Sequence, residues 1–366
     1  MAGPLEGVRV IEMDAIGPVP LAGMLLADMG AEVVRIGRPG GAGGAGRAGG
    51  AGGGDAGSTV LNRGKTRVAL DLKQPDQRDR LLDLIASADA LMEGSRPGVM
   101  ERLGLGPDDC HARNPRLVFV RLTGWGQEGP LAQSAGHDLN YIAMTGALGA
   151  MGAADAPPPV PLNLVGDYAG GTMFAVSGLL AALLSAQRTG KGQVVDVAMV
   201  DGVVNLMAMF QAFLAGGMWR DRRQANLLDG AMPFYRCYPC KDGHVSVGAL
   251  EPQFFALLVD KLGFAPDAFH QHDPAGWPDM AAAFAGKFAV MTREEIGALF
   301  LGSDACVAPV LSLTEAMAHP ANVARGVFVE RDGVTQAAPA PRFSATPAGI
   351  GEQGELDVDA AIARWA

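Results

Sequence analysis

The N-terminal part of the chain follows the order strand, turn, helix, strand, and this order constrains the fold more than any other feature. Residues 8–13 (VRVIEM) and 31–36 (AEVVRI) are short runs rich in Val and Ile, which is typical of buried strands. Between them, the turn at 14–20 leads into an apolar helix predicted at 21–29 and ended by Gly30. Two strands joined through a helix pair in parallel, so this part predicts half of a Rossmann-like sheet.

The same alternation of strand and helix continues along the chain. Each later strand is again a short apolar run, and each helix has apolar side chains at helical spacing. The further predicted strands are residues 67–72, 90–93, 118–123 and 194–197, and the predicted helices between them are residues 76–88 and 171–186. We therefore expect an α/β fold whose Rossmann-like large domain contains a parallel sheet covered by helices.

The pattern changes in the second half of the sequence, where we expect a smaller α+β domain. Residues 234–240 and 244–247 alternate around Lys241-Asp242-Gly243, which predicts a β-hairpin with an Asp-Gly turn. Helices are predicted at residues 201–216, 252–262, 279–288, 293–300 and 357–365. The predicted organisation is a large domain at residues 1–200, a linker helix region at 201–228, a small domain at 229–322 and a return to the large domain at 328–366.

Residues 40–57 are almost entirely Gly and Ala and interrupt this alternation. The segment 41–46 formally fits the dinucleotide-binding pattern G-x-G-x-x-G. That fingerprint works by placing a phosphate at the N-terminus of a helix, and no apolar helix pattern follows here. Gly64-Lys65-Thr66 lacks the glycine that a phosphate-binding loop needs five positions earlier, where Thr59 stands. A flexible loop is therefore the better interpretation of residues 40–57.

Composition restricts the class of protein. A net charge of −10 over 366 residues argues against general nucleic-acid binding, which needs a basic surface. Four cysteines in a chain of this length favour a reducing compartment, and we expect a cytoplasmic protein. The apolar stretch 172–184 is too short to span a bilayer and the stretch 198–219 contains Asp201, so no membrane span is expected.

The segment from residue 35 to residue 73 is basic although the whole chain is acidic. It holds seven basic residues against the two acidic residues Asp55 and Asp71. The basic residues are Arg35, Arg38, Arg47, Arg63, Lys65, Arg67 and Lys73. Such a cluster at strand ends favours a small polyphosphate ligand, and a solvated surface is the alternative that charge alone leaves open.

The motifs for metal and nucleophilic chemistry are weak. Cys237 and Cys240 form a C-x-x-C pair inside the predicted hairpin, whereas a zinc site needs further ligands at suitable spacing and a redox pair normally opens a helix. We interpret the pair as structural and expect no metal. The sequence contains neither a G-x-S-x-G nucleophile motif nor an H-E-x-x-H motif.

Four ionisable residues remain as candidates for acid–base chemistry. His137 and Asp138 lie just before an apolar run, Asp167 lies just before the helix predicted at 171–186, and Glu251 lies in the small domain. Each also has an ordinary structural explanation. A histidine near an apolar helix is often a capping or core residue, and Asp167 could be the N-cap of its helix. The residues alone leave both interpretations open.

A resemblance decides between them. The chain resembles the family III CoA-transferase superfamily, and within it the bacterial α-methylacyl-CoA racemases, in ordered segments that span nearly the whole sequence. These segments are residues 16–18 (IGP), 31–36 (AEVVRI), 93–99 (EGSRPGV), 101–107 (ERLGLGP), 123–127 (TGWGQ), 135–141 (AGHDLNY), 163–167 (NLVGD), 190–196 (GKGQVVD), 247–254 (VGALEPQF) and 304–310 (DACVAPV).

The resemblance implies a homodimer of two interlocked chains that acts on acyl-CoA. It assigns the basic segment to the phosphates of CoA, and because CoA is part of the substrate no separate cofactor is expected. The CoA contacts that it implies are Arg38, Leu70, Asp71, Leu72, Lys73, Gly94, Ser95, Arg96, Arg102, Gly136, Asp138, Leu139, Asn140 and Tyr141. Ser95 stands where an aromatic residue is expected, which departs from the family pattern.

The resemblance also implies a reaction, the interconversion of (R)- and (S)-2-methylacyl-CoA thioesters through an enolate. His137 and Asp167 would exchange the α-proton on opposite faces, and Glu251 would orient His137. Backbone N–H groups around Asp167 would stabilise the enolate oxygen. One alternative is a family III CoA-transferase in which Asp167 is the nucleophile. Another is a CoA-binding protein without catalysis. His137 favours the racemase, since a transferase has no evident need for it.

Overall fold

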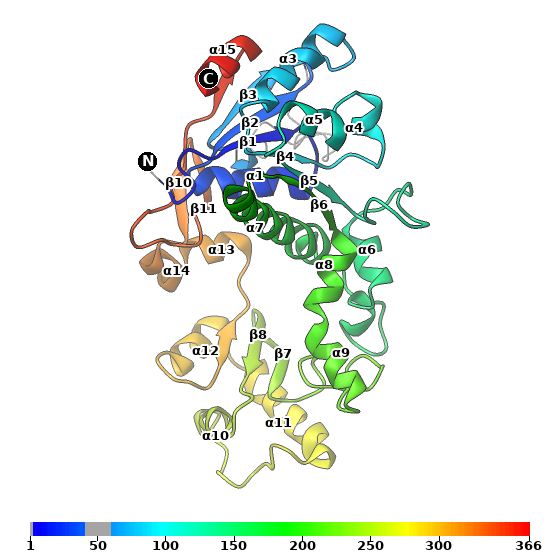
Figure 1. Cartoon of the computed structure of the whole chain (residues 1–366). Coiled ribbons are helices and arrows are strands. Elements are labelled where there is room, and N and C mark those ends of the chain that lie inside the picture. Colours follow the sequence, from blue (N-terminus) through cyan, green and yellow to red (C-terminus); the bar gives the residue numbers. More distant parts are fainter. Residues whose placement is uncertain (1–2, 41–59) are drawn as a thin grey trace. The chain divides into compact units, whose positions relative to one another are not determined.

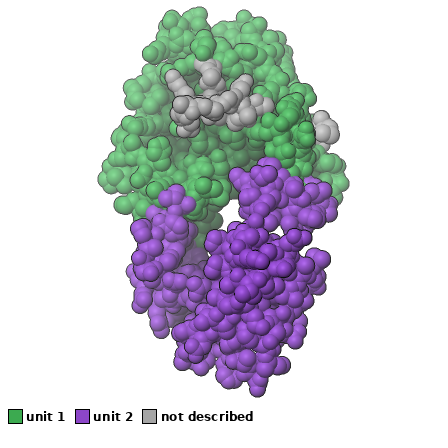
Figure 2. Space-filling view, turned by 180° about the vertical axis from the view of Figure 1, so that it is seen from behind, with its two compact units in different colours: residues 1–145, 161–206, 327–366 green, residues 146–160, 207–326 purple. Residues whose placement is uncertain are grey.

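The computed structural model describes residues 3–40 and 60–366, so the loop predicted at 40–57 lies outside the described residues except for Gly40. The chain forms two compact units (Figure 2). Unit 1 contains residues 1–145, 161–206 and 327–366, and unit 2 contains residues 146–160 and 207–326. The predicted small domain, 229–322, lies wholly within unit 2, which extends beyond it on both sides. Residues 146–160 group with unit 2 rather than with the segments around them.

Unit 1 is built on a seven-stranded sheet with the order β12-β3-β2-β1-β4-β5-β6 (Figure 1). Every pairing in it is parallel, which confirms the predicted α/β fold. The strands are β1 (Arg9–Met13), β2 (Glu32–Gly37), β3 (Lys65–Ala69), β4 (Ala90–Glu93), β5 (Val118–Thr123), β6 (Gln193–Ala198) and β12 (Gly354–Leu356).

Helices cover both faces of the sheet because its central strands are apolar on both sides. Along β1, Val10 joins one core cluster and Ile11 joins the other. The first cluster is completed by α1 (Pro18–Asp28) and α7 (Met173–Thr189), and the second by α3 (Pro75–Ile85) and the C-terminal α15 (Val358–Trp365). Trp365 is almost fully buried there, so the end of the chain packs within unit 1.

The remaining elements of unit 1 are short. They are α4 (Val99–Arg102), α5 (Pro107–Arg113), α6 (Asp138–Met144), a π-helix η3 (Leu164–Thr172), α8 (Met199–Leu206) and the hairpin of β10 (Phe328–Arg331) and β11 (Val334–Ala337). A 3-10 turn, η2 (Leu148–Ala150), belongs to unit 2.

The apolar helix predicted at 171–186 is longer than expected, because η3 continues directly into α7. Among the described residues, the stretch 164–189 is the one that is long and apolar enough to cross a membrane by length and composition alone. Half of its most apolar window is buried, and α7 packs on β5, β6 and α1. These contacts are those of a core helix.

Unit 2 contains the three-stranded antiparallel sheet β7-β8-β9 and its covering helices. Its core is aromatic and centres on Phe234, Phe255, Phe284 and Phe288. The predicted hairpin is confirmed, since Cys240 of β7 pairs with Gly243 of β8 across the turn. The elements are α9 (Ala208–Ala215), β7 (Tyr235–Cys240), β8 (Gly243–Gly248), α10 (Pro252–Lys261), η4 (Pro274–Gly276), α11 (Trp277–Ala289), α12 (Arg293–Phe300), β9 (Val307–Pro309), α13 (Leu313–Ala318) and α14 (Pro320–Arg325).

Two further helices differ from their predictions. The single helix predicted at 201–216 is wrong, because α8 ends at Leu206 and α9 begins at Ala208 in the other unit. Met207 lies between them with ψ of 4°, and no Gly or Pro marks the break in the sequence. The first helix begins at Pro18 rather than at Leu21, because a proline is favourable in the first helical turn, where its missing N–H has no partner to lose.

The strand order creates a switch point beside β1. From β1 the chain proceeds outward to β2 and β3, and then returns to place β4 on the other side of β1. The loops that follow β1 and β4 therefore lead to different faces of the sheet. Open parallel sheets bind ligands in the crevice that such divergent loops leave at the carboxyl ends of the strands.

Candidate active site

A cavity of about 810 Å³ lies at this carboxyl edge of the sheet in unit 1. Three of its lining segments come from strand ends, namely residues 16–20 after β1, residues 94–97 after β4 and residues 122–125 at the end of β5. The other lining residues come mainly from the segment just before α6 and from the start of η3. The cavity therefore occupies the switch point and has a volume typical of small-molecule sites.

His137 and Asp167, the predicted acid–base pair, both line this cavity. His137 directly precedes α6, and its backbone N–H donates to Oδ1 of Asn140 at 3.1 Å, which fixes the start of that helix. Asp167 lies within η3, near its beginning. The two side chains come from separate elements, and they are close enough for their charges to interact.

The Asp167 carboxyl is partly buried. Burial is the largest influence on it and raises the pKa of Asp167 above its ordinary value, and the negative charge of Asp138 raises it further. A hydrogen bond from Asn163 Nδ2 to Asp167 Oδ2, at 3.3 Å, and the proximity of His137 act in the opposite direction. Asp167 therefore retains a proton more readily than an exposed aspartate, a property that suits acid–base catalysis.

Asp138 binds the first turn of η3. Its Oδ2 atom accepts the N–H groups of Gly166 at 2.6 Å and of Asp167 at 2.7 Å. Asp167 is therefore not the N-cap of its helix, because a carboxylate from α6 occupies the role of a cap. The prediction that backbone N–H groups around Asp167 stabilise an enolate is wrong for these two groups, since both are already engaged.

Tyr141 holds the segment that precedes His137. Its hydroxyl donates to the carbonyl oxygen of Gly136 at 2.5 Å, and its ring meets Trp125 edge-on with centroids 4.9 Å apart. A Cβ atom on Gly124 would lie 2.1 Å from the Tyr141 ring, so only glycine fits there. Burial, followed by the nearby charge of Asp167, raises the pKa of Tyr141, which keeps the hydroxyl protonated as a donor.

The residues predicted to contact CoA divide into two groups. Gly94, Ser95, Arg96, Gly136 and Tyr141 line the cavity. The others do not line it. Arg38 and residues 70–73 follow β2 and β3 at the same carboxyl edge, and Arg102 lies in α4. Asp138, Leu139 and Asn140 lie in α6, where Asp138 binds the backbone N–H of Asp167. The remaining predicted catalytic residue, Glu251, precedes α10 in unit 2.

The interpretation of the basic segment as a phosphate site is wrong for three of its residues. Lys65 is 2% exposed, and its Nζ donates to Glu12 Oε2 at 2.7 Å and to the carbonyl oxygen of Pro20 at 2.9 Å. Arg63 is also buried and binds the carboxylate of Asp28 through Nε at 3.0 Å and Nη2 at 2.5 Å. Arg35 pairs with Asp14 at 3.2 Å. These cations stabilise the fold and are not available to a ligand.

Several cavity residues were not predicted as functional residues. Gly17, Trp125, Asn163 and Tyr168 all line the cavity. Asn163 carried the clearest signal, since it stands four positions before Asp167, a spacing that places two side chains on one face of a helix. For Gly17 the sequence offered only its place in a Gly- and Pro-rich turn after β1.

The cysteines and histidines form no metal centre among the described residues. Within 3–40 and 60–366, no three His, Cys, Asp or Glu side chains are grouped so that they could hold a metal ion. Cys237 and Cys240 are both free, and both belong to β7. The described part of the chain thus offers no ligand set from which to build metal chemistry.

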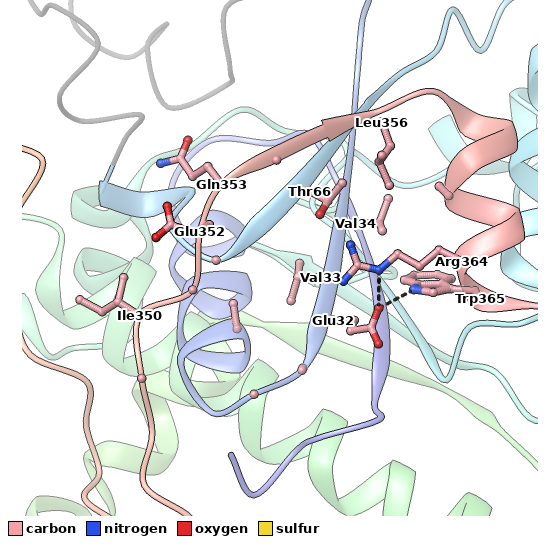
Figure 3. A pocket seen from close by; sticks show the side chains of 18 residues that line it. Glu32, Val33, Val34, Thr66, Ile350, Glu352, Gln353, Leu356, Arg364 and Trp365 are labelled. Atoms are coloured by element: carbon pink, nitrogen blue, oxygen red, sulfur yellow. Dashed lines mark hydrogen bonds and ion pairs between the residues drawn. The ribbon is translucent and has the colours of Figure 1, made fainter. Parts of the chain in front are cut away.

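A second cavity, of about 440 Å³, lies beneath the C-terminal return of the chain (Figure 3). It is bordered by β2, Thr66 and the segment that leads into β12. Both carboxylates in its lining are already bound. Glu32 Oε2 accepts a hydrogen bond from Trp365 Nε1 at 3.1 Å and lies 3.2 Å from Arg364 Nε (Figure 3), and Glu352 pairs with Arg331. None of the predicted catalytic residues lines this cavity, so the cavity at the switch point is the candidate active site.

Comparison with known proteins assigns the chain to a family. The model of the family described as CoA-transferase family III matches residues 5–354. Alpha-methylacyl-CoA racemase of Mus musculus is 42% identical over 94% of this chain and 87% of its own length. Succinyl-CoA–D-citramalate CoA-transferase of Chloroflexus aurantiacus is 31% identical over 95% of this chain and 89% of its own. The crystal structure of a CAIB/BAIF family protein from Brucella suis matches with a TM-score of 0.84 at 25% identity, over 100% of this chain and 99% of that one.

Proposed function

The chain belongs to CoA-transferase family III, and from this premise we propose that it is an isomerase that interconverts (R)- and (S)-2-methylacyl-CoA thioesters. The observation that carries the proposal is the placement of His137 and Asp167 in one cavity at the switch point of the sheet. The extensive identity with a racemase supports the same activity.

The reaction needs an acid–base group on each face of the substrate. The thioester carbonyl acidifies the α-proton, yet the carbon acid stays much weaker than a carboxylic acid. One group removes the proton and leaves a planar enolate, and the other group returns a proton to the opposite face. His137 and Asp167 exchange these roles with the configuration of the substrate, and each such group typically contributes about 10²–10⁴-fold.

The properties of Asp167 support this role. Because burial raises its pKa, the carboxyl is a better proton acceptor than an exposed aspartate, and its protonated form persists to higher pH as the donor for the other epimer. Trp125 and Met199 in the lining give the cavity apolar surface for an acyl chain. Methionine suits varied hydrophobic chains because its thioether is flexible and polarisable.

The CoA moiety is proposed to bind along the carboxyl edge of the sheet. Arg38, Lys73, Arg96 and Arg102 supply positive charge for its phosphates, and the peptide groups of 70–73 and 94–95 supply polar contacts. Proton transfer at a thioester α-carbon needs no redox group, so the proposed reaction requires no cofactor beyond the CoA of the substrate. Glu251 is proposed to orient His137 and to raise its basicity.

A homodimer is proposed as the working form. In unit 1, α7 and α8 expose large apolar side chains, and α9 does so in unit 2. These side chains are Met173, Leu184, Val204, Leu206, Met209 and Leu214. Exposed apolar patches of this kind mark protein interfaces. Sedimentation at several protein concentrations tests the assembly. The cytoplasmic location stays a prediction that cell fractionation would test.

Deuterium exchange tests the reaction. Incubation with (S)-2-methylacyl-CoA in D2O is expected to give epimerised product with deuterium at the α-carbon. The variants His137→Ala and Asp167→Asn each retain one base, so each is expected to exchange the α-proton of one epimer only, and without inversion. The two variants should act on opposite epimers. Exchange of neither epimer by the wild type would overturn the racemase proposal.

A CoA-transferase is the second candidate, because Asp167 lines the cavity and a transferase relative covers nearly the whole chain. In that reaction the Asp167 carboxylate attacks the thioester carbonyl and expels the CoA thiolate, which leaves an acyl–aspartyl anhydride. The thiolate then attacks the aspartyl carbonyl, releases the donor acid as a carboxylate and leaves CoA as an aspartyl thioester. A second carboxylate takes up the CoA by the same two steps in reverse. The same incubation distinguishes the two. A transferase gives no α-deuterium, but moves CoA to an added carboxylate and forms a hydroxylamine-sensitive adduct at Asp167. A CoA-binding protein without catalysis gives neither product.

A further inference from the structure

Asp138 links the two residues of the proposed acid–base pair. It follows His137 directly in the sequence, and its Oδ2 atom accepts the N–H of Asp167 itself at 2.7 Å. The side chain is 5% exposed. Its Oδ1 atom is buried and has no hydrogen-bond partner among the described residues. A buried carboxylate with one unsatisfied oxygen is costly, so its presence calls for a reason beyond helix capping.

We propose that Asp138 is a positioning residue that holds the first turn of η3 so that the Asp167 carboxyl faces the cavity, and that its negative charge strengthens Asp167 as a base. This inference rests on the proposed function.

The geometry supports the positioning role. Asp138 accepts hydrogen bonds from two successive backbone N–H groups, those of Gly166 and Asp167. The nitrogen of Asp167 is bonded directly to the Cα atom that carries the reactive side chain. A Cβ atom on Gly166 would lie 2.8 Å from Asp138 Oδ2, so the close approach requires glycine. A shift of about 1 Å in a reacting group can cost on the order of 10²-fold in rate, so this anchor has a direct kinetic value.

The negative charge of Asp138 affects Asp167 because the two carboxylates are close together in a partly buried site. The other ionisable groups that interact with Asp167 from this part of the chain are His137, just before α6, and Tyr141, within α6. Arg96, in the loop after β4, interacts with Tyr141. The charged groups on β6 and α8, Asp196 and Asp201, interact with each other. Among residues 3–40 and 60–366, Asp138 is thus the one negative neighbour that raises the pKa of Asp167, in the same direction as burial. A stronger base is useful because the α-proton is only weakly acidic.

The variant Asp138→Asn tests both parts, since it preserves size and an acceptor oxygen but removes the charge. We expect kcat to fall about 10-fold, with a smaller change in KM, because an uncharged acceptor holds the N–H groups less firmly. The active pair holds one proton between its two members, so acid inactivates the enzyme by adding a second. Removing the Asp138 charge lowers the pKa of Asp167, and the acidic limb of the kcat/KM profile is expected to move to lower pH.

A control variant separates charge tuning from simple capping. Asp357 also caps a helix of unit 1, since its Oδ1 accepts the N–H of Ala360 at 2.7 Å at the start of α15, and it lines neither cavity. Asp357→Asn is expected to leave kcat and the acidic limb unchanged. An Asp138→Asn enzyme with unchanged kcat and an unchanged acidic limb would overturn the proposal.

Carboxyl-¹³C NMR of aspartate-labelled protein makes the test independent of activity. The Asp167 resonance is identified by its absence in Asp167→Asn, and its titration is expected to shift to lower pH in Asp138→Asn. If the wild type fails to epimerise its substrate but this shift occurs, the proposed function fails and the electrostatic role of Asp138 stands. If the wild type epimerises and no shift occurs, the inference about Asp138 fails alone. Should Asp138→Asn not fold, Asp138→Ser is measured in the same way, and failure of both to fold would assign Asp138 to the fold and overturn the proposal.

Discussion

The Oδ2 atom of Asp167 lies 3.3 Å from the point where a Cβ atom on Gly17 would stand. Gly17 follows β1 and precedes α1 with φ of 75°, a conformation that favours glycine. The end of the first strand therefore defines one wall of the space that the proposed base occupies. This relationship joins two segments that are far apart in the sequence and explains why a side chain is excluded from the turn.

The variant Gly17→Ala is expected to lower kcat by about 10-fold or more, because the added methyl group displaces the Asp167 carboxyl. Backbone strain at positive φ should also cost about 1–2 kcal/mol of stability. Steady-state kinetics and thermal melting measure the two effects. Gly7→Ala is the matched control, since Gly7 has φ of 83° and no atom within 4 Å of its Cβ position. Equal loss of kcat in both variants would refute a specific contact with Asp167.

The variant Asp167→Asn is expected to be more stable than the wild type at neutral pH. Burial raises the pKa of Asp167 in the folded state, so the fold favours the protonated form, and this contribution to stability is lost as pH rises through the folded-state pKa. Asparagine is uncharged at every pH and avoids that loss. The difference in Tm between variant and wild type should be positive near pH 7 and should shrink towards acid. A difference that does not vary between pH 4 and pH 8 would contradict the assignment.

The variant Tyr141→Phe isolates one hydrogen bond of the site. It removes the bond from the hydroxyl to the carbonyl of Gly136 and preserves the packing of the ring against Trp125. We expect a loss of about 0.5–1.5 kcal/mol in stability and a fall in kcat, because the segment that carries His137 becomes less fixed. Urea denaturation and kinetics provide the measurements. Full kcat in a folded Tyr141→Phe enzyme would show that the bond has no part in orienting His137.

The strands of the sheet were the most predictable part of the fold. Residues 90–93 and 118–123 are strands with the predicted bounds, because short apolar runs buried on both faces have a distinct pattern. The three residues of β12 have no such pattern, since their pairing with β3 depends on the return of the C-terminus. The break between α8 and α9 at Met207 could not be predicted from the sequence either, because both helices are apolar and no Gly or Pro separates them.

The candidate site was predictable only through motifs. His137 and Asp167 stood out because of the segments that surround them, whereas the approach of Gly17 to Asp167 depends on the packing of η3 against α1. The basic segment misled the prediction for a physical reason. The partner carboxylate of Lys65, Glu12, lies inside an apolar strand, where a sequence pattern does not indicate that it pairs with a distant cation.

The buried pair of Lys65 and Glu12 supplies the last prediction. Glu12 is fully buried, and its Oε2 would lie 1.7 Å from a Cβ atom on Gly23, so α1 passes directly over the carboxylate. Burial raises the pKa of Glu12 and lowers that of Lys65, and their mutual attraction opposes both shifts. Lys65→Met leaves an uncompensated buried carboxylate and is expected to cost about 3–5 kcal/mol. The loss should be smaller in acid, where Glu12 becomes protonated.

The double variant Lys65→Met/Glu12→Gln is expected to recover much of that stability, because a neutral amide replaces the stranded charge. Urea denaturation of the wild type, both single variants and the double variant gives the interaction energy between the two positions. A pair that couples through charge yields an interaction of at least about 1 kcal/mol, whereas additive losses would mean that Lys65 stabilises the fold through its bond to the Pro20 carbonyl alone.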